Sequence, residues 1–247
     1  MLGFNKLSFF VLILFQEYLA TVNGIDDTGP EQSFSPLEHF CLCQFRIFKT
    51  MQDFSPLFNH IAPHIIFSTE EEALFVSALR TIKVKRKQLL EQPGYVSKYR
   101  SFVVSGAFRA FILATDGQEH TISLAVDGGW IGDYGSFMLQ QPATSFVEAL
   151  EDSTLIQWSY ESEQMLLKAI PQFALVMMRR SQQIAVTIQQ RVISHLSLSA
   201  EQRYEEFARQ YPELLLRIPL YIIASYLGMT REFLSKIRNQ KAAPKDR

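Results

Sequence analysis

Near the C-terminus stands Ile222-Ile-Ala-Ser-Tyr-Leu-Gly-Met-Thr-Arg-Glu-Phe-Leu-Ser-Lys-Ile-Arg238, which predicts two short helices joined by a tight turn. Gly228 can adopt φ > 0 without steric cost and end the first helix. Thr230 can accept hydrogen bonds from the free N–H groups that begin the second. Apolar residues recur at helical spacing, so we expect a buried face made of Ile222, Ile223, Tyr226, Leu227, Phe233, Leu234 and Ile237.

The polar side chains of this segment fall on the outer faces of the second helix. A short helix with Arg, Glu, Ser and Lys near its N-terminus is typical of the helix that a helix-turn-helix inserts into the major groove of DNA. There Arg and Lys donate to guanine, and Glu accepts from cytosine. The alternative is a helix pair that binds no nucleic acid, which is also common. The predicted DNA-binding set is Thr230, Arg231, Glu232, Ser235, Lys236 and Arg238.

The local charge favours the DNA hypothesis. Residues 231–247 hold six Lys or Arg side chains against two acids, whereas the whole chain has a net charge of −1. A positive pole on a nearly neutral protein is the electrostatic feature expected of a surface that contacts phosphates.

Composition and cysteine content indicate an ordinary globular protein. The chain has 247 residues, enough for one large or two small domains with a proper core. Its two cysteines, Cys41 and Cys43, lie one residue apart, a spacing that suits neither a zinc site nor an ordinary disulfide. We therefore expect a reducing, cytoplasmic location.

Residues 1–50 are predicted to be an N-terminal extension outside the folded domains. Lys6 and the apolar run at 7–15 resemble the start of a signal peptide, but the run is shorter than the roughly 20 residues that span a bilayer. An exported or membrane-tethered protein is one alternative. We favour the other, in which residues 1–50 are not native domain sequence, Met51 is the true start, and no membrane partner is expected.

Residues 51–165 predict a β-domain preceded by helix. The pattern is helical over about 54–79, with a capping box at Ser68–Glu71. Between residues 81 and 159 short apolar strands alternate with turns, and Asp116-Gly117 is a strong hairpin signal. Many short strands at near-regular spacing indicate a small sandwich or barrel.

A long helix is predicted over residues 171–197, because Pro171 suits the first helical position. A helix of about 25 residues would be about 37 Å long. Its apolar residues are separated by steps of four and seven: Phe173, Met177, Ile184, Ile188, Val192 and Leu196. We expect this stripe to pair with its copy in a second subunit; the alternative is that it packs on the β-domain.

The order of a β-domain, a long helix and a compact helical domain resembles the Crp/Fnr superfamily of transcription regulators, especially a branch abundant in Bacteroidetes. The similarity covers roughly residues 55–240. Besides the segment ending at Arg238, the motifs that carry it are Leu198-Ser-Ala-Glu-Gln-Arg-Tyr204, Tyr211-Pro-Glu-Leu214, Ile218-Pro219, Gly129-Trp-Ile-Gly-Asp133 and Val147-Glu-Ala-Leu-Glu-Asp152. The resemblance implies an α+β fold: an antiparallel, jelly-roll-like β-roll at 51–165, a dimerisation helix at 171–197 and a winged helix-turn-helix at 198–247.

The resemblance also suggests how DNA is bound. Members that respond to cyclic AMP carry Arg-Glu-x-x-x-Arg at the start of the recognition helix, and the matching residues here are Arg231, Glu232 and Lys236. Lysine lacks the planar two-donor fork of arginine, so a bidentate guanine contact is not expected at residue 236. The target sequence of those members therefore does not transfer.

The effector site departs further from the family pattern. Nucleotide-binding members carry Gly-Glu-Leu and then Arg-Ser/Thr-Ala, whose Arg pairs with the cyclic phosphate. Here Asp133 replaces the acid and no arginine follows, which removes a charge-assisted hydrogen bond of about 1.5–3 kcal/mol. Arg109 is an alternative cation, although we interpret it as a solvent-facing strand residue. The resemblance leaves as pocket candidates Gly132, Asp133, Ser136, Thr144 and Ser145, with cyclic AMP disfavoured and no other cofactor expected.

No motif indicates an enzyme or a metal site. The five histidines lack metal-ligand spacing, apart from His60 and His64, which have Pro63 between them and no accompanying carboxylate motif. Glu148, Glu151 and Asp152 are interpreted as a solvated strand end, and no phosphate-cradling glycine loop is present.

These observations predict a cytoplasmic, homodimeric transcription regulator that binds an inverted repeat in double-stranded DNA through residues 231–240. RNA polymerase and an unknown small-molecule effector are further candidate partners. The competing hypothesis is a ligand-sensing β-roll protein that acts through protein–protein contacts and does not bind DNA.

Overall fold

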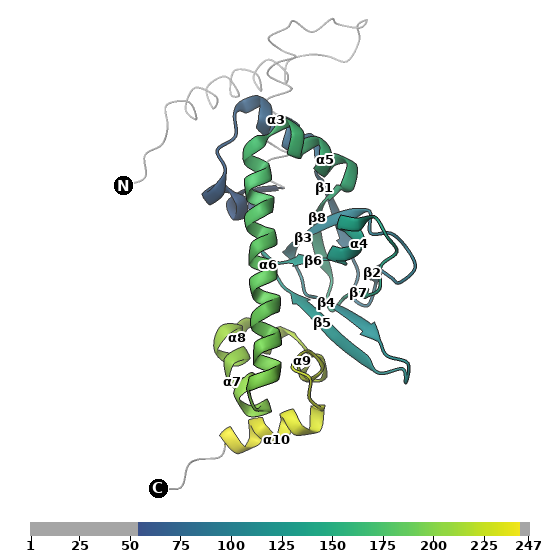
Figure 1. Ribbon diagram of the computed structural model, residues 1–247, viewed down its shortest axis with the longest axis vertical. Coiled ribbons are helices and arrows are strands. Elements are labelled where there is room, and N and C mark those ends of the chain that lie inside the picture. The colour runs from purple at the N-terminus through teal and green to yellow at the C-terminus, as the bar shows by residue number, and fades with distance from the viewer. Residues whose placement is uncertain (1–53, 243–247) are drawn as a thin grey trace, which may run out of the picture. The chain divides into compact units, whose positions relative to one another are not determined.

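The computed structural model describes residues 54–242 (Figure 1). The signal-like segment, the start at Met51, both cysteines and the basic residues 245 and 247 lie outside this range. Within it, no helix is both long and apolar enough to cross a membrane. The elements described below confirm the predicted α+β class.

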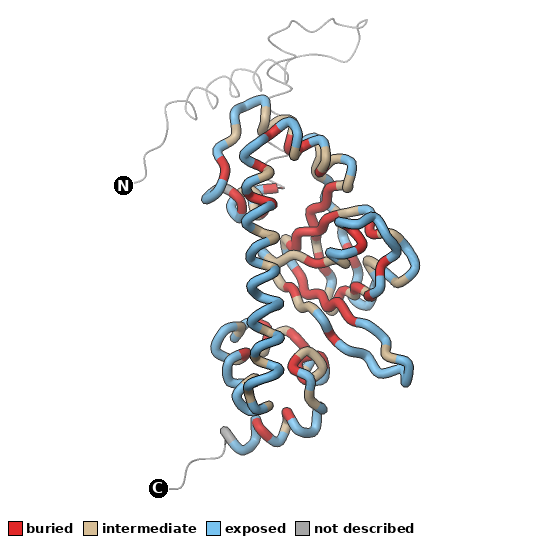
Figure 2. Tube along the Cα trace, in the orientation of Figure 1, coloured by how far each residue is buried: buried red, intermediate tan, exposed pale blue. Residues whose placement is uncertain are grey.

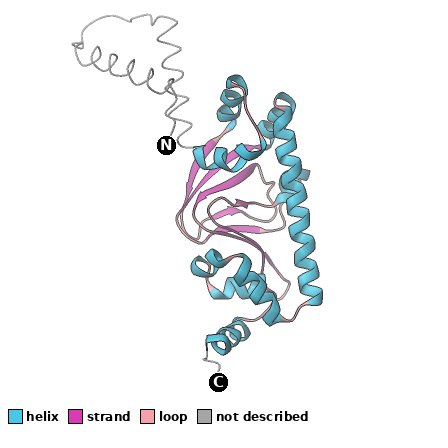
Figure 3. Cartoon of the chain, turned by 90° about the vertical axis from the view of Figure 1, so that its left-hand side faces the viewer, coloured by secondary structure: helices cyan, strands magenta, loops and turns pink. Residues whose placement is uncertain are grey.

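Two antiparallel four-stranded sheets form the β-roll (Figure 3). Their strand orders are β1-β8-β3-β6 and β2-β7-β4-β5. The strands are β1 (Arg80–Val84), β2 (Leu89–Glu91), β3 (Tyr99–Ser105), β4 (Phe108–Leu113), β5 (Glu119–Ala125), β6 (Trp130–Ile131), β7 (Phe146–Ala149) and β8 (Ser153–Ser159), with a short helix α4 (Tyr134–Leu139) between β6 and β7. Apolar residues from both sheets form one core that includes Val103, Phe108, Val147 and Leu155. The predicted hairpin joins β4 to β5, with Gly117 at φ +82°.

Helices on the N-terminal side cover the outer face of the first sheet. Residues 54–61 are helical and are followed by the 3-10 turn η1 (Ala62–His64) and by α3 (Thr69–Ala78). The pattern predicted over 54–79 is therefore interrupted, with Pro63 in the first turn of η1. The capping box is confirmed: Ser68 and Glu71 bond each other's backbone N–H groups. Aromatic residues dominate this core, among them Phe75, Phe102, Trp158 and Phe173.

Helix α5 (Tyr160–Ala169) leads into α6 (Pro171–Ser197), which begins at the predicted proline. The predicted apolar stripe of α6 divides into two parts. Phe173 and Met177 are buried in the aromatic core, whereas Ile188 and Val192 are 59% and 52% exposed. Phe173 and Met177 therefore pack on the β-roll, as in the alternative left open from the sequence, while much of α6 beyond them faces solvent (Figure 2).

The C-terminal helices form a third core. They are α7 (Ala200–Gln210), α8 (Pro212–Arg217), α9 (Leu220–Tyr226) and α10 (Arg231–Ala242). Ile222, Ile223 and Leu234 are almost fully buried between them. The two helices predicted for the helix-turn-helix, α9 and α10, are present with a turn between them, but residues 200–242 hold helices and no strand, so the expected wing is absent from this part of the chain.

Candidate functional site

The turn between α9 and α10 has the geometry that its sequence predicts. Gly228 adopts φ +67°, and the Thr230 hydroxyl accepts a hydrogen bond from the Phe233 N–H at 3.2 Å. Leu234 and Ile237 are buried at 0% and 2% exposure and fix the inner side of α10. Phe233 corrects the prediction, because it is 39% exposed and lies outside the buried face.

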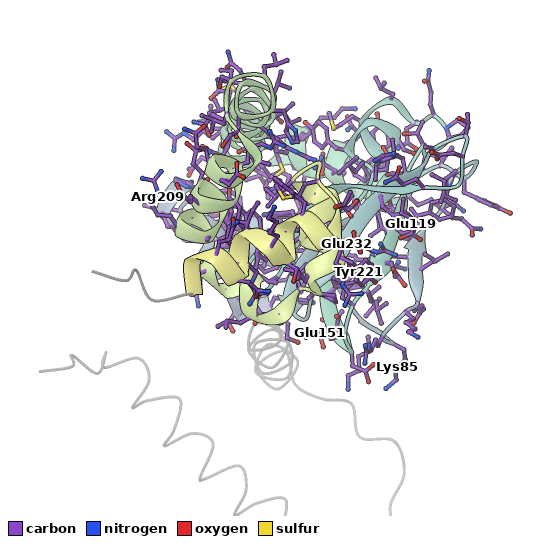
Figure 4. All side chains as sticks on the ribbon, turned by 90° about the horizontal axis from the view of Figure 1, so that it is seen from below. Lys85, Glu119, Glu151, Arg209, Tyr221 and Glu232 are labelled. Atoms are coloured by element: carbon purple, nitrogen blue, oxygen red, sulfur yellow. The ribbon has the colours of Figure 1, made fainter. Side chains whose placement is uncertain are left out.

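The opposite side of α10 is open to solvent. Arg231, Glu232, Lys236 and Arg238 are exposed, and Ser235 is half-buried. Figure 4 looks onto α10, which crosses the front of the view, with Glu232 labelled. None of the ion pairs among residues 54–242 involves Arg231, Lys236 or Arg238. Five of the six predicted DNA-binding residues thus lie on one accessible, cationic helix, and Thr230 immediately precedes it.

The helix-turn-helix is held by contacts that the sequence did not reveal. Arg191 on α6 donates to the carbonyl oxygens of Ile122 on β5 and Tyr226 on α9, at 2.5 and 3.0 Å. The Ser225 hydroxyl accepts from the Thr121 N–H and donates to the Glu119 carbonyl. Because β5 is an edge strand, these side chains satisfy backbone groups that would otherwise face solvent. They anchor the scaffold helix α9 from which α10 projects.

The effector-pocket candidates come together around Asp133. Its carboxylate caps α4 by accepting from the Ser136 N–H at 3.0 Å. It also accepts from the Thr144 N–H at 3.0 Å, the Ser145 N–H at 3.2 Å and the Ser145 hydroxyl at 2.9 Å. The chain's own carboxylate therefore occupies the N–H donors of this loop. Gly132, with φ +148°, brings the backbone close to Glu91, which accepts from the Asp133 N–H.

The loop contains no cation that could bind a phosphate. Ala143, which precedes Thr144 where nucleotide-binding members carry arginine, is buried. Arg109 was expected to face solvent, and this is wrong: it is 6% exposed on β4 and bonds Glu148 at 2.8 Å and Glu119 at 2.6 Å. Cross-strand carboxylates thus neutralise this arginine and leave it unavailable for an anion.

The acids near the end of β7 are not merely solvated, as the sequence had suggested. Glu148 bonds Arg109, Glu151 pairs with Arg217 on α8, and Asp152 pairs with Lys85 at 2.9 Å. They have structural roles, and no group of three or more His, Cys, Asp or Glu side chains within the described residues could hold a metal ion.

Asp133 should make the stability of the protein depend on pH. Partial burial tends to raise the pKa of this carboxyl, but hydrogen bonds from Ser136, Thr144 and Ser145 outweigh burial and lower it. A lowered folded-state pKa contributes stability above the unfolded pKa that is lost as pH falls through the folded value. We expect Asp133→Asn to lower the free energy of unfolding at pH 7 by about 1–3 kcal/mol. The difference in unfolding free energy between wild type and Asp133→Asn should shrink below about pH 4, near the pKa of an unfolded Asp. Urea titrations between pH 7 and pH 3 would measure this difference. A difference that stays constant over this range would contradict the role of Asp133.

The comparisons with known proteins agree with this geometry. Residues 81–169 match the family model of the cyclic nucleotide-binding domain. No curated protein matches the sequence. Among solved structures, FixK2 from Bradyrhizobium japonicum is similar at 18% identity and a TM-score of 0.59, over 66% of this chain and 83% of that one. The c-di-GMP-responsive global regulator CLP from Xanthomonas campestris is similar at 15% identity and a TM-score of 0.55, over 70% of this chain and 91% of that one.

A mutant of CooA from Carboxydothermus hydrogenoformans is similar at 20% identity and a TM-score of 0.54, over 73% of this chain and 82% of that one. These likenesses cover 66% to 73% of the chain, more than the residues 81–169 that match the family model. The resemblance drawn from the sequence is confirmed at the level of the fold, and residues 81–169 are similar to the cyclic nucleotide-binding domain.

Proposed function

We propose that the protein is a sequence-specific, DNA-binding transcription regulator. The observation that carries the proposal is α10, whose apolar side is locked into the helical core while Arg231, Lys236 and Arg238 stay exposed and without ion pairs to described residues. In a helix-turn-helix, such a face supplies contacts to base edges and to neighbouring phosphates. The structural similarity to CLP, a global regulator linked to gene expression, supports the same class of function.

The working unit in this proposal is a homodimer formed along α6. The exposed residues of this helix include a repeat with alternating steps of three and four: Leu175, Met178, Gln182, Ala185, Gln189, Val192 and Leu196. This spacing places them at the a and d positions of a two-stranded coiled coil. Leu175, Met178, Val192 and Leu196 are between 50% and 83% exposed in the single chain. This stripe replaces the predicted one, of which it keeps Val192 and Leu196.

A dimer with two-fold symmetry should bind an inverted repeat whose half-sites are about one helical turn apart. Selection of bound sequences from a random DNA pool tests this directly. We expect enrichment of a palindromic sequence with half-site centres about 10 base pairs apart. If no DNA sequence is enriched over the starting pool, the competing function is favoured, in which the β-roll acts through protein contacts alone.

The β-roll of this regulator is proposed not to bind cyclic AMP in the usual way. Asp133 already accepts from the N–H groups of Thr144 and Ser145, and Ala143 supplies no positive charge. An incoming phosphate would displace a carboxylate and find no cationic partner. Calorimetric titration with cyclic AMP should therefore give no binding at micromolar concentrations. A dissociation constant in the micromolar range or below would contradict this, and it would leave the DNA proposal intact.

A further inference from the structure

A second group of charged residues lies between α6 and the first sheet. Arg180, on α6, places its guanidinium carbon 4.1 Å from the centre of the Trp130 ring on β6. Its Nε atom is buried and has no hydrogen-bond partner. The residue as a whole is half-buried. A cation–π contact stabilises the charge but does not satisfy an N–H donor.

The nearby carboxylate is already used. Glu163 on α5 is 2% exposed and accepts from Arg100 Nε at 2.5 Å, from Arg100 Nη2 at 2.7 Å and from Trp158 Nε1 at 2.8 Å. Both of its oxygens are therefore engaged by groups other than Arg180. Arg100 thus takes this acid, and no ion pair among residues 54–242 involves Arg180.

Burial lowers the pKa of Arg180 to about 9, and repulsion from Arg100 adds to the effect. The side chain is nevertheless a cation at pH 7. A buried charge of this kind is costly unless a counter-ion is available. Burial removes the water that would stabilise the charge, and the neighbouring Arg100 repels it.

Other basic residues belong to the same region of the structure as Arg180. Arg179 is exposed and lies 3.4 Å from the His64 Nδ1 atom. His60 accepts from Trp130 Nε1, and its pKa is lowered by burial and by the charge of Arg180. Helix α6 itself contains arginines and a histidine but no acid between residues 171 and 197. The surroundings of Arg180 therefore attract anions and offer them unused donors.

We propose that Arg180, on a helix whose charged side chains are all basic, binds a small anion that carries a carboxylate or phosphate group. The anion would take the free N–H donors of Arg180 and tie α6 to β6. At 100° per residue, Arg180 lies on the side of α6 opposite to the proposed coiled-coil stripe, so dimerisation leaves the site open. It uses other residues than the Asp133 loop, whose donors are filled.

The two tryptophans of the chain report on this site. Trp130 contacts Arg180, and Trp158 lies 5.3 Å from Trp130 between ring centres. Their emission should change saturably when the full-length protein is titrated with inorganic phosphate, or with succinate in a parallel series, at constant ionic strength. Arg180→Gln should weaken the affinity at least tenfold. Arg86→Gln, which removes an exposed arginine from the β1–β2 turn, is the matched control and should bind as wild type does.

Thermal melts separate binding from a purely structural role. The preferred anion should raise the Tm of wild type and of Arg86→Gln but not that of Arg180→Gln. In chloride buffer Arg180→Gln should melt no lower than wild type, because it removes a buried, unpaired charge. Arg180→Met provides a second variant that keeps the length of the side chain.

Equal phosphate and succinate titrations for wild type and Arg180→Gln, or no saturable response in wild type, would overturn the proposal. So would a lower melting point of both Arg180 variants combined with no stabilisation of wild type by either anion.

Discussion

Val192→Asp is expected to convert the dimer into monomers and to abolish tight binding to an operator. Val192 is 52% exposed in the single chain and lies in the proposed stripe of α6. Bringing two aspartates together in a desolvated interface is strongly unfavourable. A monomer reads one half-site, and losing the second linked contact lowers the affinity by about 10²–10⁴-fold. Sedimentation velocity would measure the mass and fluorescence anisotropy the affinity.

The matched control is Gln183→Asp, which places the same charge on an exposed part of α6 outside the stripe. It should remain dimeric and bind the operator. A Val192→Asp protein that sediments as a dimer with unchanged affinity would show that α6 does not form the interface through this face.

The helix-turn-helix could be predicted in detail because its signals are local. Gly228 ends one helix and Thr230 begins the next, and both do so within a few residues of the groups they bond. The same holds for the capping box at Ser68, which the structure confirms. Such features depend on neighbours in the sequence, so the sequence alone suffices to find them.

Which side of α6 packs on the sheet could not be predicted from the spacing of its apolar residues alone. This helix has apolar residues on two sides, one packed on the aromatic core through Phe173 and Met177 and one exposed through Leu175 and Met178. Periodicity finds apolar stripes, but it cannot tell which of two stripes the sheet will cover. The steps of three and four from Leu175 to Leu196 were available in the sequence and would have indicated a coiled-coil face.

Long-range partners account for the remaining differences. Arg109 was expected to be exposed, but Glu119 and Glu148 from the two neighbouring strands cover it. The sequence identified Asp133 as the replacement for the family acid. It did not indicate that the loop at 143–145 folds back to donate to that carboxylate. These contacts depend on strand pairing and loop closure, which local pattern does not encode.

Arg231→Ala is expected to lower the affinity for the selected operator by about 1–3 kcal/mol and to relax its specificity. That loss corresponds to roughly 5- to 150-fold in the dissociation constant. In the proposed function the exposed arginine at the start of α10 would donate to base edges, whereas alanine would leave those acceptors without a partner. Arg209→Ala is the matched control: it removes one exposed arginine from α7, which Figure 4 shows at a distance from Glu232.

The decisive measurement compares the affinity of wild type, Arg231→Ala and Arg209→Ala for the selected operator and for random DNA at the same salt concentration. If the outer side of α10 reads DNA, Arg231→Ala loses most of its preference for the operator, while its affinity for random DNA changes little and Arg209→Ala behaves as wild type. Equal operator binding by wild type and Arg231→Ala would contradict the account.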